Sequence, residues 1–156
     1  MTVIGIDAST NYTGISVMVD SKLMDYDLLD CHRIKDTDTR IYKMIHEITD
    51  YLDGISSIDK ILIEESILKT NVATVKYLSY ICGAVMLYAS QRLIELKRVL
   101  PSQWRAKVGI KQNNNIKREK LKQEAVEMVN ELFGITVSDD IAESILIAQS
   151  EFINNK

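Results

Sequence analysis

Residues 2–9, TVIGIDAS, and residues 60–66, KILIEES, decide the fold of this chain. Each segment is a short apolar run of strand length that ends in an acidic residue, Asp7 in the first and Glu64 in the second. If the two strands are parallel neighbours, their carboxyl ends coincide and the two carboxylates face each other. Open α/β sheets place their functional sites at this end of the strands. The two segments therefore predict a sheet with an acidic site at one edge.

The segments around these strands predict one α/β domain over residues 1–156, a length typical of one domain. Further strands are predicted over 13–20, 22–34 and 96–100, and helices over 38–53, 71–94, 117–133 and from Ser138 onward. Three strands followed by alternating helices and strands favour a mixed five-stranded sheet with helices on both faces.

Two more acidic residues, Asp140 and Glu143, open the last helix at positions i and i+3, so they project from one face. Each acid alone also fits an ordinary role, such as a turn at a strand end or the first turn of a helix. Together, four carboxylates that converge without a lysine or arginine among them would repel one another and raise their pKa values. Divalent cations relieve such repulsion, and two Mg²⁺ ions can activate a water and stabilise a leaving phosphodiester oxygen.

The motifs GIDAS and ILIEES, with an Asp-x-x-acid start of the last helix, resemble those of RuvC-type Holliday junction resolvases. The compact form, with PSQWR over 101–105, looks more like phage members than bacterial housekeeping ones. The resemblance implies a ribonuclease H-like fold, a homodimer, and Mg²⁺- or Mn²⁺-dependent nicking of branched DNA that leaves 5′-phosphate and 3′-hydroxyl ends. It assigns the metal-binding and catalytic roles to four acids: Asp7, Glu64, Asp140 and Glu143.

Two of these assignments have a competing register, because Glu65 follows Glu64 and Asp139 precedes Asp140. The family pattern favours Glu64 and Asp140, and it has aspartate where this chain has Glu143. The aromatic wedge that family members carry after the glutamate-bearing strand falls near Ile67 or Leu68. Stacking on bases at the branch point is therefore in doubt, and relaxed junction selectivity is expected.

The net charge of −3 hides a basic segment from Lys97 to Lys122, in which nine basic residues face one acidic residue, Glu119. Local charge governs contacts with a polyanion, so this segment is a candidate DNA-binding surface, although a solvated face is the ordinary explanation. The candidate DNA contacts are Arg105, Lys107, Lys111, Lys117, Arg118 and Lys120. Trp104, in the same segment, is expected to be a core anchor more often than a DNA-facing residue.

The helix over 71–94 is the expected dimer interface, because its apolar surface is wider than packing on one sheet face requires. The residues that widen it include Tyr77, Tyr80, Leu87 and Ile94. No apolar run approaches the ~20 residues that span a membrane, and no targeting segment is evident, so a cytoplasmic protein is expected. Cys31 and Cys82 lie in apolar runs and are expected to be reduced, packed thiols.

Two other functions compete with a nuclease. GIDAST also resembles the phosphate loop of actin-like phosphotransferases, but Ala8 stands where that motif needs glycine, and one domain is present where those enzymes need two. No nucleotide cofactor is therefore expected. A non-catalytic junction-binding module is the second alternative, and four acids beside DNA phosphates argue against it.

Overall fold

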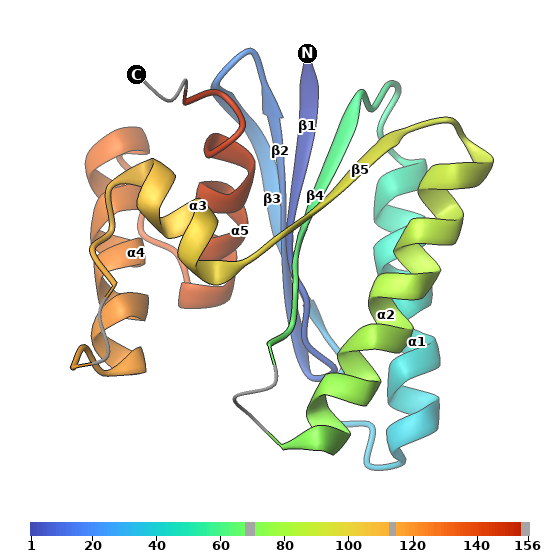
Figure 1. The fold of residues 1–156 in the computed structure, drawn as a ribbon. Coiled ribbons are helices and arrows are strands. Elements are labelled where there is room, and N and C mark those ends of the chain that lie inside the picture. The colour runs from blue at the N-terminus through green and yellow to red at the C-terminus, as the bar shows by residue number, and fades with distance from the viewer. Residues whose placement is uncertain (68–70, 113–114, 154–156) are drawn as a thin grey trace.

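The computed structural model describes residues 1–67, 71–112 and 115–153. The strands are β1 (Thr2–Asp7), β2 (Tyr12–Val19), β3 (Lys22–Asp30), β4 (Lys60–Glu64) and β5 (Glu95–Val99). The helices are α1 (Thr37–Asp53), α2 (Val72–Gln91), α3 (Pro101–Val108), α4 (Arg118–Phe133) and α5 (Asp139–Gln149). Figure 1 shows the predicted mixed sheet with helices on both faces, which confirms the fold class.

The five strands form one sheet in the order β3-β2-β1-β4-β5. β1 is antiparallel to β2 and parallel to β4, and β4 is parallel to β5. Ile6 of β1 pairs with Ile63 of β4, so Asp7 and Glu64 follow side by side at the carboxyl ends of neighbouring strands. The predicted pairing of the two acidic strands is therefore confirmed.

Each face of the sheet has its own apolar core. α1 and α2 cover one face, and α3, α4 and α5 lie on the other (Figure 1). Ile4, Ile6 and Ile63 belong to the core under α1 and α2. Val3 and Leu62 belong to the core under α5, because successive side chains of a strand point to opposite faces. The central strands β1 and β4 are thus buried on both sides, which explains their uninterrupted apolar sequences.

The structure departs from the sequence prediction in two segments. β3 ends at Asp30 instead of residue 34, because His32 and Ile34 donate backbone hydrogen bonds that form turns with Asp30 and Cys31. Residues 101–108, for which no helix was predicted, form helix α3. Proline is favoured at the first helical position, where its missing N–H costs nothing, so the same residue that ends β5 also starts α3.

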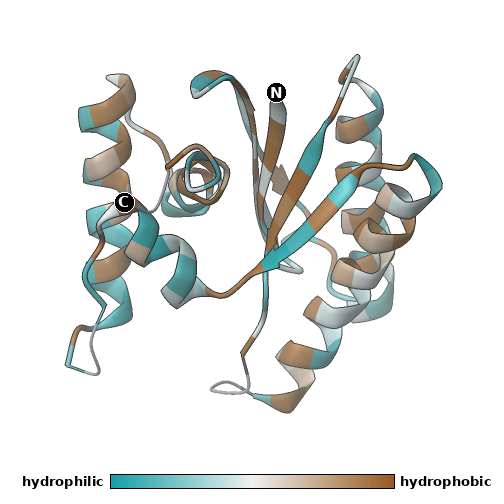
Figure 2. Cartoon of the chain, turned by 45° about the horizontal axis from the view of Figure 1, so that its top comes forward, coloured by the Kyte–Doolittle hydropathy of each residue, from teal (hydrophilic) through white to brown (hydrophobic). Residues whose placement is uncertain are grey.

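Helix α2 has a wide apolar surface that the rest of the chain covers only in part. Its buried residues are Ile81, Val85, Tyr88 and Ala89, and Figure 2 shows hydrophobic residues recurring along it. By length and composition alone, α2 is long and apolar enough to cross a membrane. This corrects the expectation that no apolar segment approaches the ~20 residues of a membrane span. A single such helix is weak evidence of a span. The same surface suits contact with a second protein chain.

Candidate active site

The carboxyl ends of β1 and β4 place Asp7 and Glu64 on the α5 side of the sheet. Ile6 and Ile63 point toward α1 and α2, so the residues that follow them point the other way, toward α5. Both ends lie at the bottom of the sheet in Figure 1, beside the first turn of α5.

Two strand glycines let α5 pack directly on β1 and β2. A Cβ atom on Gly5 would lie 2.0 Å from the backbone oxygen of Ser144, and one on Gly14 would lie 1.9 Å from that of Asp140. Any side chain at these positions would push α5 away from the sheet. The close contact brings Asp140 and Glu143 beside Asp7. It was not predicted from the sequence, although a glycine inside a strand often marks a close approach of another backbone.

Carboxylate repulsion at this site is visible in the pKa values. Burial raises the pKa of Asp7 well above its ordinary value, and the negative charges of Glu64, Glu143 and Asp140 raise it further. Burial also raises the pKa of Glu64 to about 6, against a hydrogen bond from Trp104 that lowers it. The pKa of Asp140 is raised by burial and then by the charge of Asp139. The four predicted acids thus form one interacting group.

The structure separates the two neighbouring acids in each of the ambiguous pairs, Glu64 with Glu65 and Asp139 with Asp140. Glu65 forms an ion pair with Arg98 of β5 at 3.2 Å, outside the acidic group. Asp139 forms an ion pair with Lys122 of α4. Glu64 and Asp140 are therefore the members of each pair that lie with Asp7.

Arg105 is the main departure from the predicted site, which had no basic residue among the carboxylates. Its Nη2 atom lies 2.6 Å from Oε1 of Glu143, and both side chains are buried. Helix α3, absent from the prediction, carries Arg105 into this position. The side chain predicted to contact DNA from the surface is instead paired with one of the four acids.

The neighbouring Trp104 also reaches the acidic group. It is fully buried in the core under α5, which confirms the expectation of a core anchor. Its Nε1 atom donates a hydrogen bond of 2.6 Å to Oε2 of Glu64. Nothing in the sequence pattern indicated this bond, because it depends on how α3 turns back toward β4.

The remaining predicted DNA contacts divide into two locations. The charge of Arg118, at the start of α4, lowers the pKa values of Glu64 and Asp140, which places it near the acids. Lys117 and Lys120 are exposed in the same region of α4, and Lys111 is exposed in the preceding loop.

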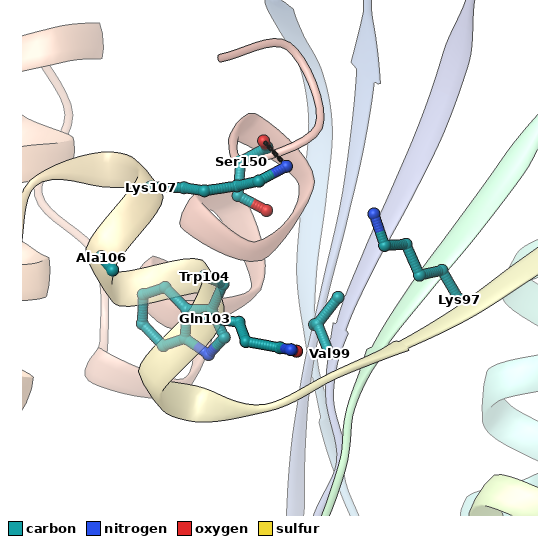
Figure 3. A pocket seen from close by; sticks show the side chains of 7 residues that line it. All are labelled: Lys97, Val99, Gln103, Trp104, Ala106, Lys107 and Ser150. Carbon is teal, nitrogen blue, oxygen red and sulfur yellow. Dashed lines mark hydrogen bonds between the residues drawn. The ribbon is translucent and has the colours of Figure 1, made fainter. Parts of the chain in front are cut away.

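Lys107 does not lie with the acids. Its Nζ atom donates to the backbone oxygen of Ser150, at the opposite end of α5 from Asp140 (Figure 3). There it lines a pocket of about 380 Å³ together with Lys97 and Trp104. At the expected wedge position, Ile67 is 37% exposed, and Leu68 lies outside the described residues.

The donor chemistry of the acidic group fits Mg²⁺ or Mn²⁺, because all four side chains offer carboxylate oxygens. As they stand, however, no three acidic, histidine or cysteine side chains in the described ranges are gathered closely enough to hold an ion. Trp104 and Arg105 each engage an oxygen of one glutamate. An ion that binds Oε1 of Glu143 would compete with Arg105 for this oxygen.

Comparison with known proteins identifies the family and the fold. A family model described as crossover junction endodeoxyribonuclease RuvC matches residues 3–150. A comparison with curated proteins found no similar sequence. Among solved structures, RuvC of T. thermophilus in complex with a Holliday junction substrate has a TM-score of 0.75 and 17% identity, over 96% of this chain and 91% of that one.

Two further solved structures share the fold. The yeast mitochondrial Holliday junction resolvase has a TM-score of 0.57 and 16% identity, over 95% of this chain and 77% of that one. The Fowlpox virus resolvase, solved with substrate Holliday junction DNA, has a TM-score of 0.61 and 14% identity, over 96% of this chain and 97% of that one. These likenesses confirm the expected ribonuclease H-like fold, and the family model over residues 3–150 shows that this chain belongs to the RuvC family of crossover junction endodeoxyribonucleases.

Proposed function

We propose that this member of the RuvC family nicks four-way DNA junctions, and other branched DNA, by metal-ion-assisted hydrolysis at Asp7, Glu64, Asp140 and Glu143. The observation that carries the proposal is the convergence of four carboxylates at the ends of β1 and β4 and on the first turns of α5. Burial and mutual repulsion make this arrangement costly for stability, and a divalent cation is the partner that offsets the cost.

The four acids would hold two Mg²⁺ or Mn²⁺ ions, with Asp7 as the acid whose pKa is raised by the charges of the other three. Such ions would lower the pKa of a bound water and stabilise the departing 3′ oxygen, which leaves 5′-phosphate and 3′-hydroxyl ends. Arg105, once Glu143 no longer pairs with it, becomes a free cation beside the scissile phosphate. Its guanidinium can then donate two hydrogen bonds to the phosphate oxygens.

The exposed cations of α4 provide the DNA contacts nearest the acids. Lys117 and Arg118 stand at the amino end of the helix, where the helix dipole also favours a phosphate group. Lys111 and Lys120 extend this surface, whereas Lys107 would contact DNA only if the duplex also reaches the far end of α5. Junction DNA as substrate suits a protein of the cytoplasm, where bacterial and phage DNA are processed.

A homodimer suits the near two-fold symmetry of a four-way junction, because two sites are needed for paired nicks. Helix α2 is the proposed interface. Tyr80 and Leu87 lie seven residues apart, hence on one helix face, and they are 47% and 60% exposed. Gly83 lies between them with open space around its Cα, so a second helix can approach closely. Lys76 is the only charged residue of α2, so burying the helix surface in an interface removes few charges from water.

The direct test incubates the protein with a synthetic four-way junction and with linear duplex of the same sequence, in Mg²⁺ and in EDTA. We expect paired nicks in the junction with Mg²⁺ only. Asp7→Asn, Asp140→Asn and Glu143→Gln should each abolish cleavage and leave junction binding in a gel-shift assay intact or tighter, because they remove negative charge near phosphates. Full cleavage by Asp7→Asn would exclude the proposed metal site.

The same experiment separates the alternatives. A non-catalytic junction-binding module would bind the junction and leave it uncut in Mg²⁺ and in Mn²⁺. The actin-like phosphotransferase alternative lacks support, since the matched family model is that of an endodeoxyribonuclease.

A further inference from the structure

We infer that Trp104 is a positioning residue for Glu64: its indole N–H holds one carboxylate oxygen and leaves the other free to bind a metal ion. The inference rests on the proposed function, because it treats Glu64 as a metal ligand. It adds a residue whose indole reaches the acidic group only through Glu64.

The geometry of the hydrogen bond is specific. Nε1 of Trp104 lies 2.6 Å from Oε2 of Glu64, and the Trp104 side chain has no exposed surface. An indole N–H can only donate, so its partner must be an acceptor such as a carboxylate oxygen. Rotation of Glu64 away from this position would leave a buried donor unsatisfied, which is costly. The bond therefore fixes the orientation of the carboxylate at the end of β4.

The indole itself is held firmly. Helix α3 starts with Pro101 at its first position, and Oε1 of Gln103 accepts a hydrogen bond from the backbone N–H of Leu100 at 3.0 Å. The Trp104 ring packs in the core with apolar residues of β4, β5 and α5, among them Leu62 and Val99. In Figure 3 the ring extends across α3 with the pocket on one side of it. A rigid support of this kind is what a group that orients a metal ligand requires.

Arg105 and Trp104 differ in charge, and each contacts one glutamate of the acidic group. Its guanidinium stacks over the Trp104 ring at 4.7 Å and pairs with Glu143. The guanidinium carries a positive charge, so it competes with a metal ion for Oε1 of Glu143. The indole N–H is neutral, so it remains bonded to Glu64 while a metal ion binds the other oxygen. One turn of α3 thus gives Glu64 a permanent partner and Glu143 a replaceable one.

Because Trp104 is the only tryptophan of the chain, tryptophan analogues alter this position alone. In 3-benzothienylalanine a sulfur atom replaces the N–H and the shape of the ring system is kept. In 5-fluorotryptophan the N–H is kept, which provides a matched control. We would measure Mn²⁺ affinity by calorimetry for both substituted proteins, for Trp104→Phe and for Glu64→Gln.

We expect about 10-fold weaker Mn²⁺ binding for the benzothienyl protein and Trp104→Phe, the usual size of an outer-shell effect, and near-normal binding for the fluorinated protein. Suppose that Glu64→Gln binds Mn²⁺ more weakly than the wild-type protein. Unchanged Mn²⁺ affinity of the benzothienyl protein, or an equal loss of affinity in the fluorinated protein, would then overturn the inference. If Glu64→Gln itself binds Mn²⁺ normally, Glu64 is no ligand, and the metal site of the proposed function fails with it.

Discussion

Glu64→Gln should make the metal-free protein more stable at pH 8. Burial raises the pKa of Glu64 from 4.5 to about 6, so its ionised form is disfavoured in the folded state. At 1.36 kcal/mol per pKa unit, the charge lowers the free energy of unfolding by about 2 kcal/mol at pH 8. Glutamine keeps an oxygen that can accept the Trp104 hydrogen bond, and it removes one of the charges that repel Asp7. For a chain of this size the melting temperature should rise by roughly 4–8 °C.

The stabilisation should depend on pH in a defined window. Between pH 4.5 and 6 the folded wild-type protein holds a proton at Glu64 that the unfolded chain has released, so its stability rises as the pH falls through 6. The advantage of Glu64→Gln is therefore complete above about pH 7 and disappears below 4.5. Thermal unfolding in EDTA from pH 4 to pH 8 measures this directly.

Glu65→Gln is the matched control, because Glu65 is the next residue and is paired with Arg98 at the surface. Exposed ion pairs contribute about 0–1 kcal/mol, so this variant should be unchanged or slightly less stable at pH 8. Mg²⁺ should stabilise the wild-type protein and Glu65→Gln but not Glu64→Gln. A Glu64→Gln protein that is less stable than wild type in EDTA at pH 8 would refute the argument.

Three further predictions concern the ion pair, the DNA surface and the dimer. Arg105→Met should lower the free energy of unfolding by about 3–5 kcal/mol, because Glu143 is left buried without its cation. Denaturant titrations measure this change, and an effect under about 1 kcal/mol would contradict a buried ion pair. Lys117→Ala and Arg118→Ala should each reduce the slope of log K against log salt by roughly 0.9, measured by fluorescence anisotropy on duplex arms. Tyr80→Glu should give monomers in light scattering and single nicks in junctions, and a wild-type monomer that makes paired nicks would exclude the α2 interface.

The sequence predicts the parts of this fold that depend on local pattern. β1 and β4 are recognisable because both faces are buried and their sequences are apolar up to the terminal acid. The start of α5 is recognisable because Ser138 accepts a hydrogen bond from Ile141 as an N-cap. These local signals place Asp7 beside Glu64, because parallel strands bring their carboxyl ends together, and they put Asp140 and Glu143 on one face of a helix. That this helix lies against the two strands was expected from the family resemblance alone.

The parts that the sequence does not reveal depend on long-range contacts. Pro101 carries two signals, the end of a strand and the start of a helix, and only packing of Trp104 against α5 and β4 decides that a helix follows. The pairing of Arg105 with Glu143 joins residues 38 positions apart, and no periodicity predicts such a contact. Gly5 and Gly14 carry a weak signal, which gains its meaning only once α5 is known to lie on β1 and β2.

The missed helix changes the physical picture of the site. Four acids alone predict a group that is strained until a metal ion arrives. With α3 in place, Arg105 balances the charge of Glu143 and Trp104 donates a hydrogen bond to Glu64, so part of the repulsion among the acids is relieved without a metal ion. A metal ion that binds Oε1 of Glu143 would have to displace Arg105 from it. The released guanidinium would stay close to the acids, and there it could stabilise negative charge on a phosphate, which is the role proposed for Arg105.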